Sequence, residues 1–285
     1  MKDQYKTTKQ PVAMEWAALL ARGFWERLIW LLFQKNYLPE QSAPRLEELG
    51  RILRPFQSED RGKTRLGRQR DGGYVMLDDF EGVNKAISLG IGNDVSWDLD
   101  IARRGIPVEQ YDHTVSAAPQ MHPLFKFHSK RIAAESQGDA GTCSLTELLR
   151  EAQKQGQEII LKMDIEGDEW DIFEKIDPSL LRCMRQIVGE FHGFREVMDD
   201  IWYYKALRAF ANLSSTHAVV HLHGNNIAQQ LAVRSLVFPE SLEITFVRRD
   251  RCTLLENHEP MPGPWDRRNH PARPDISLNI FLSQK

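Results

Sequence analysis

The chain has 285 residues, of which 41% are hydrophobic and 27% are charged. This length suits one or two domains, and the composition is that of a folded protein rather than a disordered one. Thirty-seven Lys and Arg residues against forty Asp and Glu residues give a net charge of −3, which argues against bulk nucleic-acid binding. The three cysteines are far apart and form no CxxC pair, which excludes a disulfide framework and a thiolate zinc site and favours a reducing, cytoplasmic location.

The first apolar segment, residues 16–33, is rich in Leu, Trp and Phe but is interrupted by Arg22, Glu26 and Arg27. Each of these charges would cost roughly 2.5–3.5 kcal/mol at the centre of a bilayer, so a spanning helix is not expected. We expect an amphipathic helix at 14–33 that packs on its own domain or forms a homodimer contact. A peripheral membrane contact and a cover over the substrate pocket are the alternatives.

Residues 34–70 are polar and interrupted by prolines, which predicts a linker with one short helix. They carry a local basic cluster that is interpreted either as a solvated face or as a seat for an anionic group. The members of this cluster are Arg51, Arg54, Arg61, Lys63, Arg65, Arg68 and Arg70. We therefore assign residues 1–70 to an N-terminal helical extension and linker, and residues 71–285 to the main domain.

From residue 71 onward, short apolar runs alternate with stretches that have a 3.6-residue apolar period. The expected strands are Ala86–Leu89, Val108–Tyr111, Phe125–His128, Glu158–Met163, Gln186–Phe191, Ala218–Leu222 and Leu242–Val247. The expected helices are 94–104, 144–155, 168–175 and 197–212. This alternation predicts an α/β fold, a mainly parallel sheet with helices on both faces. A long irregular stretch containing Pro239 precedes the last strand, which we expect to be antiparallel, and residues 250–275 should be mostly loop.

A glycine-rich turn, Ser88–Asp94, joins the first of these strands to the helix that follows it. Glycines at this place let the backbone approach a ligand, and the helix N-terminus presents free N–H groups. Asp112 ends the next strand, where an acid can accept hydrogen bonds from ribose hydroxyls. The third glycine of a dinucleotide fingerprint would fall at Val95, so the pattern favours a nucleoside ligand without a pyrophosphate, such as S-adenosylmethionine, over NAD or FAD.

Polar side chains follow three further strands at the points where they end. In open α/β sheets the carboxyl ends of the strands form the ligand site, so these side chains should converge on one rim. They are Asp164 and Glu166 after the fourth strand, Glu190 and His192 at the end of the fifth, and His223 and Asn225 after the sixth. Helix capping would account for Asp168 and Glu169 but comes too late in the chain to account for Asp164.

The segments DGGY (71–74), GIGND (90–94), LKMDIEGDEW (161–170) and GEFHGF (189–194), in this order and spacing, resemble the FkbM-type methyltransferases over about residues 60–250. The resemblance implies a Rossmann-like class I methyltransferase fold with S-adenosylmethionine as cofactor, and usually O-methylation of a sugar or natural-product hydroxyl. It implies that the glycine turn lines the methionine part, that Asp112 binds the ribose, that 71–74 close over the cofactor, and that 142–145 lie near the adenine. The residues so assigned to the cofactor are Asp71, Gly73, Tyr74, Gly90, Gly92, Asn93, Asp112, Ser144 and Asp164. The sequence departs from this pattern at His113, where relatives often have proline.

Methyl transfer to a small-molecule or glycan hydroxyl requires a group that takes the acceptor's proton. The candidate catalytic residues are Asp164, Glu190 and His192, and the candidate substrate residues are Glu166, His223 and Asn225. An alternative is a Mg²⁺ ion held by Asp164, Glu190 and Asn225. Two other functions share the same fold: a non-catalytic adenosyl-nucleoside-binding scaffold, and an RNA methyltransferase that uses the basic cluster.

Overall fold

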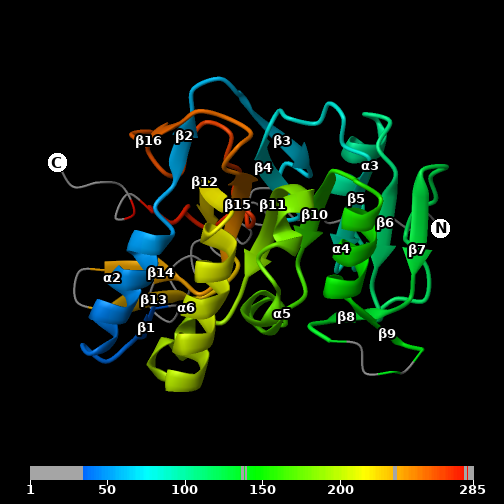
Figure 1. The fold of residues 1–285 in the computed structure, drawn as a ribbon. Helices are drawn as coiled ribbons and strands as arrows, with labels where there is room; N and C mark the ends of the chain where they lie inside the picture. Colours follow the sequence, from blue (N-terminus) through cyan, green and yellow to red (C-terminus); the bar gives the residue numbers. More distant parts are fainter. Residues whose placement is uncertain (1–34, 136–137, 139, 234–235, 279–280, 282–285) are drawn as a thin grey trace, which may run out of the picture.

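The computed structural model describes residues 35–135, 138, 140–233, 236–278 and 281 (Figure 1). The helix expected at 14–33 lies outside these residues. The elements at the start of the described chain are β1 (Lys35–Tyr37), α2 (Ser42–Ile52), β2 (Phe56–Ser58), β3 (Lys63–Gly67) and β4 (Gly73–Leu77). No helix in the described ranges has both the length and the apolar character that crossing a membrane requires.

A seven-stranded sheet forms the centre of the molecule. Its strands are β5 (Lys85–Leu89), β6 (Val108–Tyr111), β7 (Phe125–His128), β10 (Ile159–Met163), β11 (Met184–Phe191), β12 (His217–Gly224) and β15 (Leu242–Arg248). They lie in the order β12-β15-β11-β10-β5-β6-β7, in which only β15 runs antiparallel to its neighbours. All seven predicted strands and the antiparallel last strand are confirmed. This is the doubly wound Rossmann order with one reversed strand inserted, which is the class I methyltransferase fold.

The four predicted helices are also confirmed, as α3 (Ser96–Ala102), α4 (Leu145–Lys154), α5 (Glu169–Lys175) and α6 (Asp200–Ser214). The start of α6 falls later than predicted, because the 3₁₀ helix η2 (Phe194–Met198) precedes it and the Asp199 carboxylate caps it, accepting the backbone N–H of Trp202 at 2.9 Å.

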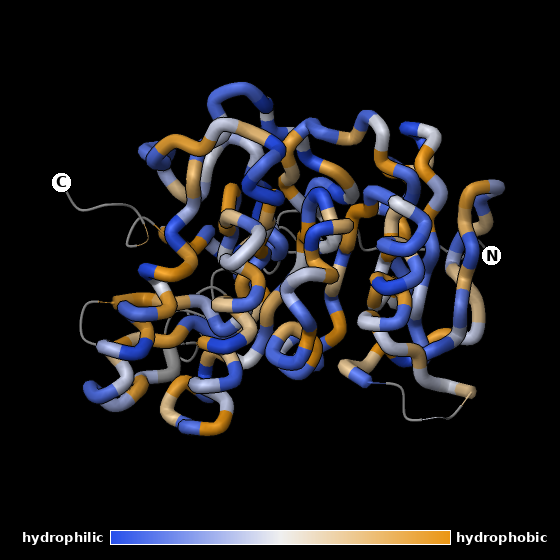
Figure 2. The backbone as a smooth tube through the Cα atoms, viewed as in Figure 1, coloured by the Kyte–Doolittle hydropathy of each residue, from blue (hydrophilic) through white to orange (hydrophobic). Residues whose placement is uncertain are grey.

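Both faces of the sheet are buried, each in its own hydrophobic cluster. One face packs against α3 and the β3–β4 hairpin, with Trp97 and Tyr74 among the buried side chains. The other face packs against α2, α4, α5 and α6, with Leu49 and Phe210 among them. Figure 2 shows hydrophobic segments in the central strands and hydrophilic ones in many of the surrounding turns. Burial on both faces explains why the central strands are apolar throughout rather than alternating.

The segment predicted to be a linker, 34–70, contributes to this packing. Leu46 and Leu49 of α2 share the larger cluster with the sheet, and α2 lies beside α6 in Figure 1. The boundary expected between residues 70 and 71 falls at the tip of the β3–β4 hairpin. That hairpin is fastened to α3 by the backbone N–H of Gly67, which donates to Asp100 Oδ2 at 2.8 Å. The assignment of two separate units at this boundary stays a prediction.

The remaining elements flank the main sheet. They are β8 (Arg131–Ala133), β9 (Thr142–Ser144), the 3₁₀ helix η1 (Leu180–Cys183), β13 (Gln230–Val233), β14 (Leu236–Pro239) and β16 (Leu254–Glu256). β13 pairs with β1 and β14, β8 pairs with β9, and β16 pairs with β2. Apart from β16, residues 250–275 are loop as predicted, and this loop runs back across the carboxyl end of β12 to bring Asn226 and His270 into contact.

Candidate active site

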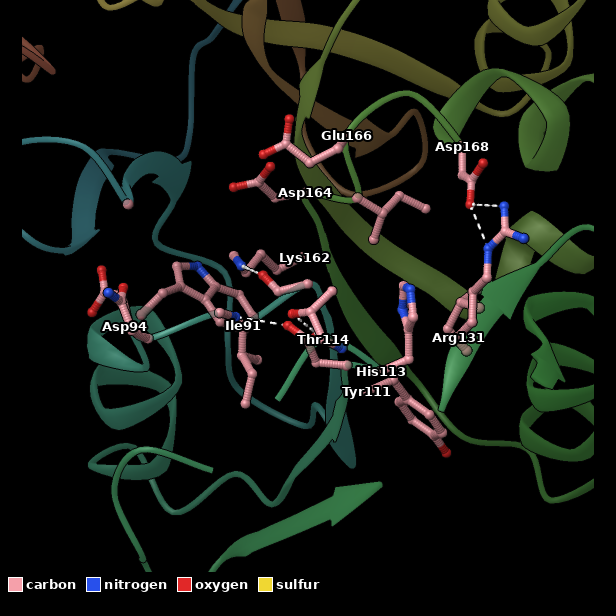
Figure 3. A pocket seen from close by; sticks show the side chains of 18 of the residues that line it. Ile91, Asp94, Tyr111, His113, Thr114, Arg131, Lys162, Asp164, Glu166 and Asp168 are labelled. Atoms are coloured by element: carbon pink, nitrogen blue, oxygen red, sulfur yellow. Dashed lines mark hydrogen bonds and ion pairs between the residues drawn. The ribbon is translucent and has the colours of Figure 1, made fainter. Parts of the chain in front are cut away.

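A cavity of about 320 Å³ opens at the carboxyl ends of β5, β6 and β10 (Figure 3). The chain crosses from one side of β5 to the other at this point, so the cavity occupies the topological switch point where open α/β sheets bind ligands. Its volume lies in the range of small-molecule sites. Of the predicted site residues, those that line it are Asp71, Gly90, Gly92, Asn93, Asp112, Asp164 and Glu166.

The glycine turn is shaped by the close approach of two strand ends. Gly90 has a φ of +71°, and a Cβ built on it would lie 1.7 Å from the backbone oxygen of Asp164. The N–H of Gly90 donates to the Tyr111 carbonyl at 3.0 Å, and the N–H of Asp164 donates to the Leu89 carbonyl at 3.1 Å. Gly92 has a φ of +49° but open space where its Cβ would be. Gly90 is thus required by the packing of β5 on β10, and Gly92 keeps one wall of the cavity clear.

Asp112 holds the turn after β6 in place. One carboxylate oxygen accepts the N–H of Gly92 at 2.7 Å, and the other accepts the N–H and the hydroxyl of Thr114 at 2.7 and 2.6 Å. Burial opposes ionisation of this group, but the hydrogen bonds from Thr114 and Gly92 outweigh it and lower the pKa of Asp112. Asp112 is therefore an ionised acceptor that lines the cavity, as the ribose assignment requires. His113 and Thr114 line the cavity beside it.

The tip of the β3–β4 hairpin lies over the glycine turn. Arg68 pairs with Asp94 at 3.1 Å between Nε and Oδ2, and the other carboxylate oxygen of Asp94 accepts the N–H of Ser96 at 2.9 Å. A Cβ on Gly72 would lie 2.3 Å from the same Asp94 carboxylate. The hairpin tip thereby places Arg68, Asp71 and Gly72 on the cavity wall, consistent with the prediction that 71–74 close over the cofactor.

A buried lysine, Lys162, holds the glycine turn through a hydrogen bond to its backbone. Lys162, on β10, is 5% exposed, and its ammonium donates to the Gly90 carbonyl at 2.7 Å. Its charge also favours ionisation of Asp98 on α3, a fully buried carboxylate that accepts a hydrogen bond from Gln110 at 2.9 Å. Burial is the larger influence and raises the pKa of Asp98. Lys162 thus links β10, the glycine turn and α3.

The predicted catalytic residues converge beside this cavity. Asp164, Glu190 and His192 present ligand atoms within 4.8 Å of one another. The Tyr74 hydroxyl donates to Asp164 Oδ2 at 3.1 Å, so Tyr74 lies behind Asp164 instead of on the cavity wall. Burial first, and then the charge of Asp164, raise the pKa of Glu190.

His192 is surrounded by carboxylates. Its Nδ1 lies 3.3 Å from Oε1 of the buried Glu169, and its Nε2 lies 3.5 Å from Glu190 and 3.7 Å from Glu166. Burial alone would lower the pKa of His192, but the hydrogen bond to Glu169 and the charge of Glu190 raise it. Both His192 and Glu190 therefore keep their protons to a higher pH than usual.

Asn225 and His223 do not line the cavity but contact Glu190 and Glu243, respectively. The Asn225 amide nitrogen donates to Glu190 at 2.7 Å, while its oxygen accepts the N–H of Ile227 at 2.8 Å. Asn225 therefore directs a donor at Glu190, and the predicted Mg²⁺ set of Asp164, Glu190 and Asn225 is not assembled as three oxygen ligands. His223 is 1% exposed and lies 3.0 Å from Glu243, so it positions that carboxylate and has no access to a substrate.

A second, open groove of about 400 Å³ adjoins the cavity, and the two share Glu166. Its other walls are Gly167, Trp170, His192, Gly193, Arg195, Glu196, Trp202, Lys205 and Glu240. Glu166 has a φ of +60°, unusual for a residue with a side chain, and that side chain is 86% exposed. Glu166 is thus the predicted residue that lines both the groove and the cofactor cavity, while His192 lines the groove.

Besides Tyr74, two further predicted cofactor residues, Gly73 and Ser144, do not line the cavity. Gly73 begins β4 against the Arg68 carbonyl, and the Ser144 hydroxyl donates to the Ala134 carbonyl at 3.1 Å. Where 142–145 were expected near the adenine, the neighbouring strand β8 contributes Ile132 and Arg131 to the wall instead. β8 and β9 are paired, so residues 142–145 lie beside this wall without lining it, and the adenine assignment stays a prediction.

Three members of the basic cluster at 51–70 make internal contacts, while its other four members, Arg51, Arg54, Arg61 and Arg70, are exposed. Lys63 pairs with Glu259 at 2.9 Å, Arg68 pairs with Asp94, and Arg65 donates to the carbonyls of Arg68 and Arg70 at 3.1 and 2.9 Å. These contacts favour a structural role for Lys63 and Arg65, whereas Arg68 also lines the cavity. The sequence analysis named Arg68 only within the basic cluster and Asp94 only as the end of the glycine turn. It missed Lys162 in the cavity wall, and Glu243 and Asn269 beside Glu190; the charged Lys162 within an otherwise apolar strand was the one available clue.

No protein-family model matches the sequence, and none of the curated protein sequences compared with it matches. Among solved structures, the chain is similar to a SAM-dependent methyltransferase from Agrobacterium tumefaciens, with 10% sequence identity and a TM-score of 0.30. The match covers 59% of this chain and 56% of that one, so it spans less than two thirds of either. The fold class rests on the strand order and not on this likeness.

Proposed function

We propose that this protein is an S-adenosylmethionine-dependent methyltransferase of the FkbM type, which methylates a hydroxyl of a sugar or small natural-product-like acceptor. One observation carries the proposal: Asp112 and the glycine turn line the same cavity as Asp164, at the switch point of a sheet with the class I order. A nucleoside-binding acid and a candidate catalytic acid therefore face one ligand.

The chemistry of the cavity wall suits this cofactor. Asp112 would accept the ribose hydroxyls, and Arg68 and Asp71 at the hairpin tip would face the amino-acid part. Val95 is 4% exposed and stands where a dinucleotide fingerprint has its third glycine, so a pyrophosphate-binding helix start is not formed. When bound, S-adenosylmethionine supplies an electrophilic methyl group.

The chain's own residues would orient the acceptor and hold its proton. The groove that shares Glu166 with the cavity is the place for the acceptor, since it leads to His192. The proton of the acceptor hydroxyl would pass to the Asp164 carboxylate, because the raised pKa values of Glu190 and His192 leave both of those groups protonated near neutral pH. Glu169 would hold the protonated imidazole of His192 in position, 3.5 Å from Glu190. Asp164 would orient the acceptor at the cavity edge, with its carboxylate fixed by Tyr74.

The test is incubation of the full chain with methyl-labelled S-adenosylmethionine and a panel of hydroxylated sugars and small natural products. Asp164→Asn should retain cofactor affinity by calorimetry and lose at least 100-fold in turnover. Asp177→Asn, at an exposed position just after the C-terminal end of α5, is the matched control and should lose nothing. Unchanged turnover in Asp164→Asn would contradict the assigned role. Cofactor binding without transfer to any acceptor, including RNA, would favour the scaffold.

A further inference from the structure

A second cluster of acids shares Glu190 with the candidate catalytic residues. Asp71, Glu190 and Glu243 present carboxylate oxygens within 4.8 Å of one another. They come from three separate elements: the tip of the β3–β4 hairpin, β11 and β15, in which Glu190 and Glu243 stand directly opposite each other. Glu190 is 7% exposed and Glu243 is 5% exposed, while Asp71 is exposed at the hairpin tip, so the cluster reaches from the interior to the cavity wall.

The basic groups around these acids do not balance their charge. His192 lies 3.5 Å from Glu190, but it also contacts Glu166 and Glu169. The other basic neighbours are His223, shared by Glu243 at 3.0 Å and Asp275 at 3.3 Å, and Arg65, whose hydrogen bonds go to backbone carbonyls. Asp164 adds a further negative charge from β10. Buried carboxylates in such excess need bound protons or a cation.

A buried amide at the same place has an oxygen without a partner. Asn269 is 3% exposed, and its nitrogen donates to Glu243 at 2.5 Å and to Asp71 at 3.1 Å, so the amide is aimed into the acid cluster. Its Oδ1 is buried and has no hydrogen-bond partner in the described structure. A buried amide oxygen normally has a partner. Rotation of the amide by half a turn would exchange its two ends and present the oxygen to the two carboxylates.

We propose that Asp71, Glu190 and Glu243 bind one divalent cation, with the amide oxygen of Asn269 as a fourth ligand. Four oxygen donors, three of them carboxylates, select a hard cation such as Mg²⁺, Mn²⁺ or Ca²⁺. This set differs from the Mg²⁺ set expected from the sequence, since it uses Asp71 and Glu243 in place of Asp164 and Asn225.

The cation would join four parts of the chain: the hairpin tip, β11, β15 and the loop after β16. Because Asp71 also lines the cofactor cavity, binding would fix the hairpin tip over that cavity. The site stands on its own contacts and holds whether or not the protein transfers methyl groups.

The test uses the full chain and Mn²⁺ as the probe, with free Mn²⁺ measured by electron paramagnetic resonance in chelator-treated protein. We expect one saturable Mn²⁺ per chain, displaced by Mg²⁺, and a higher melting temperature with the ion bound. Glu243→Gln and Asp71→Asn should weaken binding at least tenfold. Glu196→Gln, at an exposed position in the open groove, is the matched control and should bind as the wild type does.

Asp71→Asn keeps the test valid if Glu243→Gln fails to fold, since Asp71 is at the hairpin tip and is not needed by the core. The proposal is overturned if Mn²⁺ does not bind saturably, or if Asp71→Asn binds it as tightly as the wild type. Loss of binding in Asp164→Asn with full binding in Asp71→Asn would move the ion to Asp164, Glu190 and His192, and would also overturn the assignment.

Discussion

The substitution Gly90→Ala tests the idea that the glycine turn is dictated by strand packing. The added Cβ would lie 1.7 Å from the Asp164 backbone oxygen and 2.8 Å from its carbonyl carbon. Neither atom belongs to a flexible side chain, so the ends of β5 and β10 must separate. At a φ of +71°, alanine also carries a backbone strain of roughly 1–2 kcal/mol.

Separation of the strand ends would lengthen or break three hydrogen bonds. They are the bonds from Gly90 N–H to Tyr111, from Asp164 N–H to Leu89, and from the Lys162 ammonium to Gly90, with lengths of 3.0, 3.1 and 2.7 Å. Each contributes about 1 kcal/mol, and more where a charge is involved. Together with the strain, the free energy of unfolding should fall by about 3–5 kcal/mol, a large share of the stability of a typical domain.

Urea denaturation followed by circular dichroism measures this loss. Gly156→Ala is the matched control, because Gly156 has a φ of +63° with nothing within 4 Å of the added Cβ, and it should lose only about 1–2 kcal/mol. Gly92→Ala should be equally mild for stability but should weaken cofactor binding, because its Cβ would project into the cavity. If Gly90→Ala proves no more destabilising than Gly156→Ala, the packing argument for Gly90 fails.

Three further predictions follow from the site and the core. Asp112→Ala removes the acceptor of the Gly92 and Thr114 hydrogen bonds and should weaken S-adenosylmethionine binding by at least tenfold in calorimetry; unchanged affinity would exclude Asp112 from the ribose site. Lys162→Met should destabilise the fold by about 2–4 kcal/mol in urea, with partial rescue by Asp98→Asn, because the buried Asp98 loses its compensating charge; additive effects would argue against this coupling. Burial lowers the pKa of His217 to about 4, so the folded state binds fewer protons than the unfolded state between that value and about 6.5. The free energy of unfolding should therefore fall by up to about 3 kcal/mol as the pH drops from 6.5 to 4, and His217→Gln should lose that part of the slope; an unaltered slope would show that His217 is not its source.

The fold was predictable because each strand and helix has a local cause in the sequence. β10 is a short apolar run that is buried on both faces, which is typical of a central strand. In α4 and α5 the buried apolar residues recur at helical spacing, so both helices could be recognised. The segment 34–70 was more difficult. Its one predicted short helix is present as α2, but the strands β1, β2 and β3 were not predicted. These strands are short and polar, and they are stabilised by pairing with β13, β16 and β4, which are up to about two hundred residues distant in the chain.

The candidate site could be predicted where side chains directly follow parallel strands. Asp112, Asp164 and Glu190 all come at strand ends, and the carboxyl ends of parallel strands meet at one edge. Glu243 was missed because it is near the start of a reversed strand, which brings its N-terminal end to this same edge. Asn269 was missed because an irregular loop carries it, and no periodic pattern specifies where such a loop returns.

Calorimetric titration of the full chain with S-adenosylmethionine, and separately with NAD, tests the central claim most directly. The cavity between the glycine turn, Asp112 and Asp164 predicts saturable binding of one S-adenosylmethionine per chain and no binding of NAD. Binding of NAD without binding of S-adenosylmethionine would contradict the proposed function.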